Sequence, residues 1–199
     1  MSVKIQRMDF LHVEEVAALH RTGIDRGFLT RLGPKLLADL YGAINRSALG
    51  FVFVAVGGDG RIVGFVSGTT RTKGLYRSIL LRRGWRYAGL VLKKMFSPGV
   101  LRGIVQTVLY PVRGASDTPE AELLSIVVSE ELRGTTVAAD LLTVLLDEFR
   151  RRGCDRVKLM VGESMGRAHA FYLKHGFVSA GTMQQHGHRS DILVIELAG

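Results

Sequence analysis

Residues 126–146 combine an apolar strand pattern, a short polar turn and the start of an amphipathic helix. The turn reads Arg-Gly-Thr-Thr-Val-Ala at 133–138 and runs directly into the helix. Backbone N–H groups at such a turn point the same way and, with the helix dipole, favour a bound phosphate group. Arg133 adds a positive side chain beside them. The residues alone leave two interpretations open: a phosphate site, or an ordinary helix start capped by Thr135 or Thr136.

Cysteine and histidine side chains are weaker candidates for chemistry. Cys154, the single cysteine, begins a predicted strand without a recognisable partner, so we expect a packed free thiol rather than a nucleophile. His186 and His188 share one face of a predicted strand, but two ligands without a third are weak evidence for a metal site. We therefore predict no metal centre.

Residues 133–138 resemble the pyrophosphate loop of the GNAT acetyltransferase superfamily, which reads Arg/Gln-x-x-Gly-x-Gly/Ala after the fourth strand. Arg133 and Ala138 match its first and last positions, and Thr136 stands where the family usually has glycine. A β-carbon at Thr136 limits how closely the backbone approaches a pyrophosphate, so the departure lowers the expected affinity more than it changes the identification. Residues 128–132 correspond to the family's turn before this loop.

A second block, at 167–178, is similar to the family's Ala-x-x-Phe-Tyr-x-x-x-Gly-Phe pattern. The matching residues are Ala168, Phe171, Tyr172, Gly176 and Phe177. The family often has asparagine three residues before this alanine, and here Met165 takes that position. Gly176 and Phe177 would also suit any helix C-terminus that leads into a core strand. Together the two blocks identify the chain as a member of the superfamily.

The resemblance implies an enzyme that transfers an acetyl group directly from acetyl-CoA to a primary amine. It also implies that the fourth and fifth strands splay apart, with pantetheine lying between them along the backbone of Ile126 to Val128. The pyrophosphate would then sit on 133–138. The implied cofactor-binding residues are Ile126, Val127, Val128, Arg133, Gly134, Thr135, Thr136, Val137, Ala138, Met165 and Ala168.

The same resemblance assigns two proton-transfer roles. Glu122 lies six residues before Val128, where several relatives place a general base, and apolar surroundings can raise the pKa of a carboxyl towards neutrality. Tyr172 matches the tyrosine that protonates the departing sulfur in many relatives, and a phenol with a pKa of about 10 keeps its proton at neutral pH. The alternatives are an exposed glutamate at a strand end and a core tyrosine.

The hydrophobic pattern predicts the elements that would position these residues. Its order implies an α/β (α+β) fold with a mixed sheet flanked by helices. The resemblance implies that this sheet is GNAT-like, in a single domain spanning 1–199. Helices are predicted at 11–22, 34–46, 136–152 and 164–175. Strands are predicted at 3–7, in a hairpin over 51–68, and at 121–129, 155–161, 177–184 and 190–197.

Length and composition agree with one globular domain. The 199 residues are 47% hydrophobic and 23% charged, which is ordinary for a protein with a buried core. A single cysteine excludes an intrachain disulfide and suggests a reducing compartment. The first residues lack the apolar core of a signal peptide, and no run reaches the roughly 18 apolar residues of a membrane span. We expect a cytoplasmic protein.

The formal charge of +9 is concentrated in an insertion at about 70–118, between the third and fourth strands. Residues 60–116 contain eleven Lys or Arg and no Asp or Glu, whereas the rest of the chain has sixteen basic and eighteen acidic residues. A helix is predicted from about 74 to 108, broken near 97–99, with an apolar and a basic arc. The apolar arc holds Leu81, Trp85, Ala88, Leu92, Met95 and Phe96, and the basic arc holds Arg82, Arg83, Arg86, Lys93 and Lys94.

Several partners fit such an insertion. Its basic side is either a solvated surface or, over 71–113, a means of attracting an anionic acceptor such as an amino-sugar nucleotide or an acidic acyl-carrier protein. A membrane-surface helix and a nucleic-acid-binding module are the alternatives from other functional classes. Neither accounts for the two acetyltransferase blocks, and the evidence for nucleic acid is weak. A small-molecule amine remains the expected substrate, and a homodimer is left open.

Overall fold

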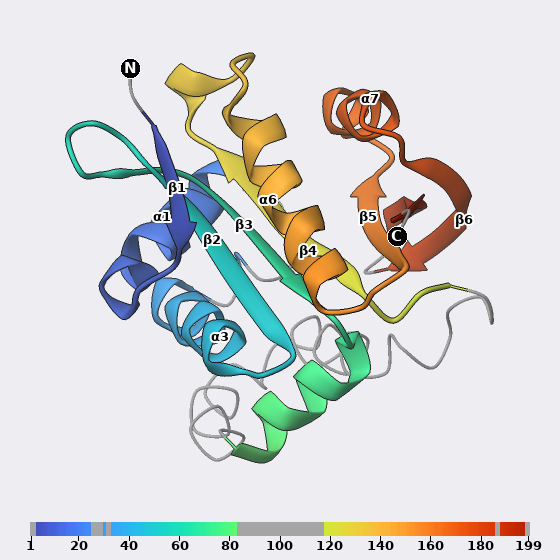
Figure 1. Ribbon diagram of the computed structural model, residues 1–199, viewed down its shortest axis with the longest axis horizontal. Coiled ribbons are helices and arrows are strands. Elements are labelled where there is room, and N and C mark those ends of the chain that lie inside the picture. Colours follow the sequence, from blue (N-terminus) through green and yellow to red (C-terminus); the bar gives the residue numbers. More distant parts are fainter. Residues whose placement is uncertain (1–2, 25–29, 31–32, 83–117, 186–187, 198–199) are drawn as a thin grey trace. The chain divides into compact units, whose positions relative to one another are not determined.

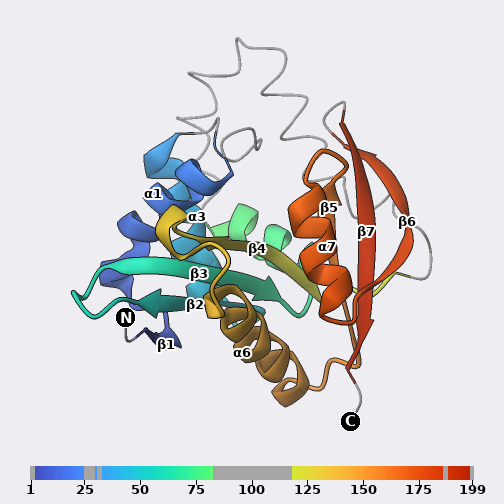
Figure 2. The ribbon, with the colours of Figure 1, turned by 90° about the horizontal axis from the view of Figure 1, so that it is seen from above.

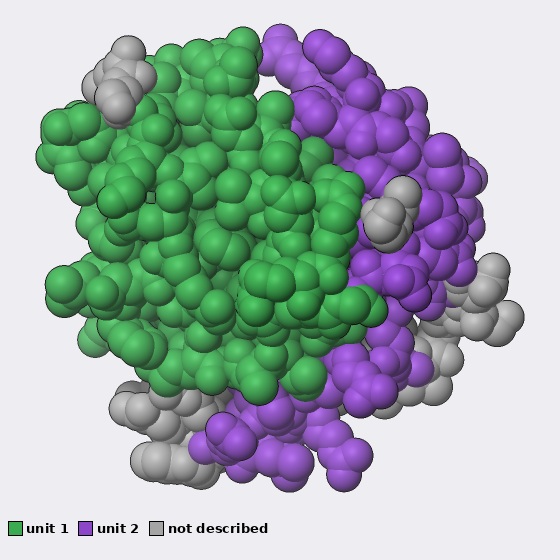
Figure 3. Space-filling view, in the orientation of Figure 1, with its two compact units in different colours: residues 1–70, 123–153 green, residues 71–122, 154–199 purple. Residues whose placement is uncertain are grey.

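The computed structural model of the chain describes residues 3–24, 30, 33–82, 118–185 and 188–197. The chain divides into two compact units (Figure 3). Unit 1 comprises Met1–Thr70 and Leu123–Gly153, and unit 2 comprises Arg71–Glu122 and Cys154–Gly199. The single domain over 1–199 stays a prediction.

Seven strands form one sheet in the order β1-β2-β3-β4-β5-β7-β6 (Figures 1 and 2). The strands are β1 (Lys4–Arg7), β2 (Gly50–Val56), β3 (Ile62–Thr69), β4 (Glu122–Val128), β5 (Arg156–Gly162), β6 (Val178–Gln185) and β7 (His188–Glu196). The α-helices whose two ends both lie within the described residues are α1 (Val13–Gly23), α3 (Pro34–Arg46), α6 (Val137–Arg151) and α7 (Gly166–Lys174). This arrangement confirms the predicted α/β class, a sheet flanked by helices.

In unit 1, β2 pairs antiparallel with both β1 and β3. Every residue of β3 is buried, as expected for a strand covered on both faces. Next to it, the amide of Ser129 donates to the carbonyl of Val63, and the hydroxyl of Ser67 lies 3.5 Å from the carbonyl oxygen of Ser125. Because these pairs run in opposite directions along the chain, β3 and β4 are antiparallel.

Helix α6 packs its apolar stripe on this sheet. Leu141, Leu145 and Phe149 are fully buried at helical spacing. The ring of Phe149 meets the ring of Phe51 edge to face, with 4.9 Å between their centroids. A β-carbon on Gly68 would lie 2.9 Å from both rings, so the close approach of α6 to β3 requires glycine there.

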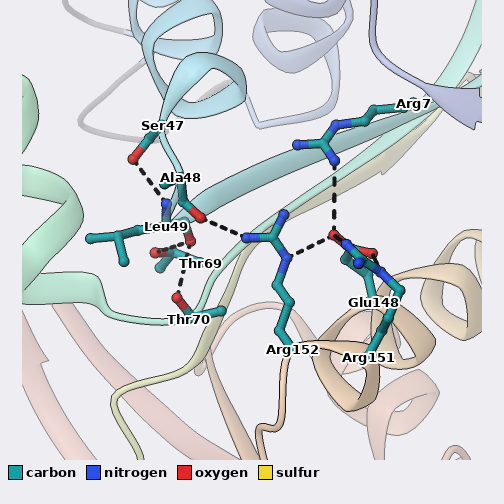
Figure 4. A network of polar contacts seen from close by, with 9 residues as sticks. All are labelled: Arg7, Ser47, Ala48, Leu49, Thr69, Thr70, Glu148, Arg151 and Arg152. Carbon is teal, nitrogen blue, oxygen red and sulfur yellow. Dashed lines mark hydrogen bonds and ion pairs between the residues drawn. The ribbon is translucent and has the colours of Figure 1, made fainter.

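The C-terminal end of α6 is fixed by a buried acid among arginines (Figure 4). Glu148 is 8% exposed and accepts hydrogen bonds from Arg151 and Arg152, and Arg7 approaches it to 3.9 Å. Arg152 also donates to the carbonyl of Ala48, at 2.7 Å. The network therefore joins α6 to the chain segment just before β2.

In unit 2, β7 pairs antiparallel with β5 and with β6. The pairing of β6 and β7 shifts between Ser179 and Gly181, which marks a bulge. Helix α7 ends before Gly176, whose φ of +89° is the left-handed conformation common after helix C-termini. Phe177 follows as a buried core residue. This is the predicted exit from the helix.

The basic segment is described only at its start, where the chain is helical over 72–82 (Figure 1). Its buried face carries Leu75 and Ile79, whereas Leu81, on the predicted apolar arc, is 74% exposed. At 100° per residue, Leu81 lies about 200° from Ile79 and therefore faces away from the buried side of this helix. The predicted apolar arc was wrong at Leu81 because it was set by the apolar positions at 85–96. Those later positions, and the rest of the predicted helix, lie outside the described residues.

None of the helices within the described ranges is long and apolar enough to cross a membrane.

Candidate active site

The turn before α6 has a defined backbone. The amides of Leu132, Arg133 and Thr135 donate to the carbonyls of Ser129, Glu130 and Leu132 in turn. Gly134 has a φ of +83°, a left-handed conformation that glycine adopts without strain. A β-carbon there would meet no atom within 4 Å, so the backbone conformation rather than crowding favours glycine.

Several backbone N–H groups at this turn have no acceptor among the described residues. These are the amides of Gly134, Thr136, Ala138 and Ala139. The first intrahelical bond of α6 runs from Asp140 to the carbonyl of Thr136, so the preceding amides are the free donors of a helix N-terminus. With the helix dipole, they form a site suited to an anionic group.

The two threonines of the turn do not cap α6 strongly. The hydroxyl of Thr136 bonds to the carboxylate of Asp140, at 2.9 Å, and caps no amide. The hydroxyl of Thr135 donates to the carbonyl of Leu132 at 2.7 Å and lies 3.4 Å from the amide of Val137. An ordinary capped helix start would therefore rest on one weak bond, from the amide of Val137 to the hydroxyl of Thr135. The amides of Gly134, Thr136, Ala138 and Ala139 remain available to an anion.

Charged side chains flank the turn. Arg133, half-exposed, pairs with Glu130 at 2.9 Å, and Glu130 is 79% exposed. Exposed pairs of this kind contribute about 0 to 1 kcal/mol, so Arg133 can exchange Glu130 for another anion at small cost. Asp140 places a negative charge in the first turn of α6, close to Thr136. The sequence spacing of both pairs, three and four residues, could have revealed them.

The strand before the turn alternates in burial. Ser125 and Val127 are buried, and Ile126 and Val128 are half-buried. This alternation puts Ile126 and Val128 on the same face of β4. The predicted pantetheine contacts of residues 126–128 remain a prediction.

Glu122, the first residue of β4, is buried at 6% exposure. The hydroxyl of Thr72 lies 2.7 Å from its Oε2, within unit 2. Burial raises the pKa of Glu122, while the Thr72 hydrogen bond and the charge of Lys158 oppose that rise. The alternative of an exposed strand-end glutamate is excluded, and burial shifts the pKa of the carboxyl in the direction that favours a general base.

Tyr172, in α7, is also buried in unit 2, at 6% exposure. Its ring packs edge to face against Phe171 and Phe177, with centroids 5.4 and 5.5 Å away. Burial raises the pKa of its phenol. No described residue forms a hydrogen bond with the hydroxyl, so a core packing role accounts for the ring and leaves the hydroxyl unused.

The other predicted cofactor contacts in unit 2 lie at the start of α7. Met165 is the N-cap residue of this helix, is 45% exposed and makes no side-chain cap. Ala168 is half-buried in the first turn of the helix. Cys154 is half-buried just before β5. His186 lies outside the described residues, and the described ranges hold no group of three potential metal ligands.

Sequence reasoning missed the surroundings of Glu122. Thr72 and Tyr76 come from the helix over 72–82, and the Glu122 charge, after burial, raises the pKa of Tyr76. Lys158 comes from β5. No local signal could identify Thr72 or Tyr76, because about 50 residues separate each from Glu122. Only the fold brings them together.

Comparisons with known proteins show the family and the fold of the chain. A sequence model described as the acetyltransferase (GNAT) family matches residues 24–177. No curated protein matches the sequence.

Solved structures share the fold. They include Ard1 from Thermoplasma volcanium, with 17% identity, a TM-score of 0.65 and 100% of both chains covered. PaiA N-acetyltransferase from Thermoplasma acidophilum, solved in complex with coenzyme A, has 14% identity and a TM-score of 0.61, with 98% of this chain and 99% of that chain covered. The ribosomal-protein-S18-alanine N-acetyltransferase from Escherichia coli has 15% identity and a TM-score of 0.62, with 100% of this chain and 96% of that chain covered.

Proposed function

This chain belongs to the GNAT family of acetyltransferases, and from that premise we propose a direct transfer of acetyl from acetyl-CoA to a primary amine. The observation that carries the proposal is the set of unpartnered amides at the N-terminus of α6. Such a set, next to a left-handed glycine, matches the needs of a pyrophosphate. Direct transfer needs no nucleophilic cysteine, and in this proposal the single cysteine, the half-buried Cys154, has no catalytic role.

Cofactor binding falls to three groups of residues in this proposal. The free amides of Gly134, Thr136, Ala138 and Ala139, on the turn and the first residues of α6, and the side chain of Arg133 would hold the pyrophosphate. The backbone of residues 126–128 would pair with pantetheine, and Met165 and Ala168 would contact the cofactor from α7. Acetyl-CoA supplies an activated thioester, and the chain's residues supply orientation and proton transfer.

Glu122 acts as the general base in this proposal. A protonated amine cannot attack a thioester, so its proton must first be removed. In this proposal the carboxylate of Glu122 accepts that proton, and burial raises the pKa of Glu122 in the direction that favours this step. The charge of Lys158 opposes the rise and favours the ionised carboxylate.

Tyr172 acts as the general acid. Its hydroxyl has no partner among the described residues, and burial keeps it protonated at neutral pH. It can give that proton to the sulfur as negative charge develops there. The two roles are complementary: Glu122 takes one proton from the amine, and Tyr172 delivers one to the leaving group.

The acceptor is proposed to be a small amine that carries negative charge. Support comes from the sequence, where residues 60–116 hold eleven basic and no acidic side chains. Positive charge of this density raises the local concentration of anions such as phosphorylated amines. We also propose a cytoplasmic location, as the sequence led us to expect. A homodimer is left open, and neither point alters the chemistry.

Cofactor binding tests the proposal first. Acetyl-CoA should raise the melting temperature of the protein, because a ligand that binds only the folded state stabilises it. Acetyl-pantetheine, which lacks the pyrophosphate, is the matched control and should stabilise much less. No thermal shift and no calorimetric signal with millimolar acetyl-CoA would contradict the assignment. A screen of amines, scored by thiol release, would then identify the acceptor.

A further inference from the structure

Thr72 makes three contacts with residues 120–122, where the chain enters β4. Its amide donates to the carbonyl of Glu120 at 3.1 Å, and its hydroxyl oxygen lies 3.0 Å from that same carbonyl oxygen. The hydroxyl oxygen also lies 2.7 Å from Oε2 of Glu122. Thr72 is 3% exposed, so water does not compete for these positions.

A threonine hydroxyl has one proton to donate and lone pairs that accept. Two oxygen atoms, the Glu120 carbonyl and the Glu122 carboxyl, lie within hydrogen-bond distance of the Thr72 hydroxyl. When Glu122 is protonated, it donates to Thr72, and Thr72 donates to Glu120. When Glu122 is ionised, the Thr72 proton turns to the carboxylate. The Glu120 carbonyl then keeps its bond from the Thr72 amide.

We propose that Thr72 is a positioning residue for Glu122, whose hydroxyl rotates to hold the carboxyl in both protonation states. This inference rests on the proposed role of Glu122 as the general base. A base must be held in one place before and after it takes a proton, and an amphoteric hydroxyl does so where a fixed donor cannot. Loss of the hydroxyl removes a charge-assisted bond from the ionised form and a neutral bond from the protonated form.

Other groups near Glu122, unlike the Thr72 hydroxyl, do not switch between donating and accepting a hydrogen bond. Tyr76, on the same helix as Thr72, is protonated at neutral pH because burial and the Glu122 charge raise its pKa. Lys158, on β5, favours the carboxylate. Arg71 pairs with Glu120 at the exposed side, with 3.2 Å between Nε and Oε2. Because the bond to the carboxylate is the stronger of the two, removing the Thr72 hydroxyl should raise the pKa of Glu122 further.

The test replaces Thr72 with valine, which keeps the shape but has no hydroxyl, and with serine, which restores it. The side-chain carboxyl of Glu122 is titrated by ¹³C NMR on protein labelled at glutamate, and its signal is assigned by its absence from Glu122→Gln. Thr72→Val should move the midpoint upward by about 1 pH unit, and Thr72→Ser should return it to the parent value. Thr72→Ala is the second variant should valine prevent folding.

Ser78→Ala is the matched control. Ser78 lies on the same helix, and its hydroxyl donates to the carbonyl of Leu75 at 2.8 Å instead of to Glu122. Its removal should leave the Glu122 midpoint unchanged. Equal midpoints in parent, Thr72→Val and Thr72→Ala would overturn the inference, as would an equal shift in Ser78→Ala.

The titration measures the effect of Thr72 on the pKa of Glu122 without an activity assay. The Thr72–Glu122 coupling and the assignment of Glu122 as the base can therefore be contradicted independently. If Glu122 is the base, the acidic limb of the kcat/KM profile should move with the NMR midpoint in Thr72→Val. An NMR shift without a kinetic shift supports the Thr72–Glu122 coupling and contradicts the base assignment. No NMR shift contradicts the coupling alone.

Discussion

Arg152 holds the carboxylate of Glu148 from the end of the same helix, with 2.7 Å between its Nε and Glu148 Oε1. Its guanidinium carbon also lies 4.6 Å from the ring centroid of Phe51. Glu148 is 8% exposed and Arg152 17% exposed, so solvent screens this pair less than a surface pair. The contact fixes where α6 ends on unit 1.

The first prediction is that Glu148 makes unit 1 sensitive to acid. Hydrogen bonds from Arg151 and Arg152 outweigh burial and lower the pKa of Glu148 from about 4.5 to about 2. A lowered pKa means that the stabilisation is present above pH 4.5 and is lost as pH falls towards 2. The parent should lose about 1 to 2 kcal/mol of unfolding free energy over that range, allowing for the exposure of Arg151. Urea unfolding at several pH values measures this.

Glu148→Gln should lower stability at pH 7 and flatten that part of the pH dependence. The matched control is Asp147→Asn, since Asp147 pairs with Arg150 at 2.7 Å but both side chains are well exposed. Its effect should stay below about 1 kcal/mol. Equal urea midpoints for the two variants would contradict the special role of Glu148.

The second prediction concerns the proposed base. Glu122→Gln should lower kcat/KM on the order of 10² to 10⁴-fold and remove the acidic limb of its pH profile, because the amide cannot accept a proton. Glu120→Gln is the control: Glu120 lies two residues earlier and is 53% exposed in a pair with Arg71. A variant that keeps both its rate and its acidic limb would show that another group removes the proton.

The third prediction concerns the proposed acid. Tyr172→Phe keeps the packed ring and should lower kcat by about 10²-fold with little change in acetyl-CoA affinity, since the hydroxyl matters as charge develops on sulfur. Tyr41→Phe is the comparison, because its hydroxyl bonds to His20 in the core of unit 1, at 2.6 Å. That variant should lose stability and retain kcat. Unchanged turnover in Tyr172→Phe would leave Tyr172 as a core residue only.

The fourth prediction concerns the helix N-terminus. Thr136→Gly should leave acetyl-CoA affinity equal or higher, because it removes the β-carbon from the anion site. No helix cap is lost, since the Thr136 side chain caps no amide. Asp140→Asn should raise affinity as well, by removing a negative charge beside the site. Calorimetric titration measures both. A large loss in Thr136→Gly would reveal a contact of the threonine side chain with the cofactor.

The fifth prediction concerns the basic segment. Replacing Arg82, Arg83 and Arg86 together by glutamine should raise the acceptor's KM and hardly affect acetyl-CoA affinity, if these charges recruit an anion. Added salt should act on the parent in the same direction. Arg150→Gln is a control at a surface outside this segment. An unchanged KM would favour a solvated surface.

Sequence patterns predicted the elements well where hydrophobic period and end signals coincide. Pro34 at the first turn of α3 and Gly176 after α7 placed those helix ends within two residues. The phase of the basic helix failed at Leu81, because a wheel assumes one buried face along its whole length. The buried face of such a helix therefore has to be determined separately for each turn.

The candidate site was predictable only in its local parts. The turn at 133–138 and its free amides follow from a strand, a glycine and a helix start that are contiguous in sequence. The raised pKa of Glu122 needed only the apolar residues of its strand. Its contact with Thr72 joins residues 50 positions apart, and no period or spacing specifies such a pair. Tertiary contacts of this kind require the fold.

The discontinuous make-up of unit 1 affects its biosynthesis. Phe51 and β3 emerge long before Phe149 and Arg152, which cover that surface from the second segment of the unit. At about 5 to 20 residues per second, the ribosome needs on the order of 4 to 17 s to proceed from residue 70 to residue 153. During that interval the hairpin of β2 and β3 has an uncovered aromatic surface. We therefore expect nascent chains arrested before residue 153 to aggregate more readily than chains in which unit 1 is complete.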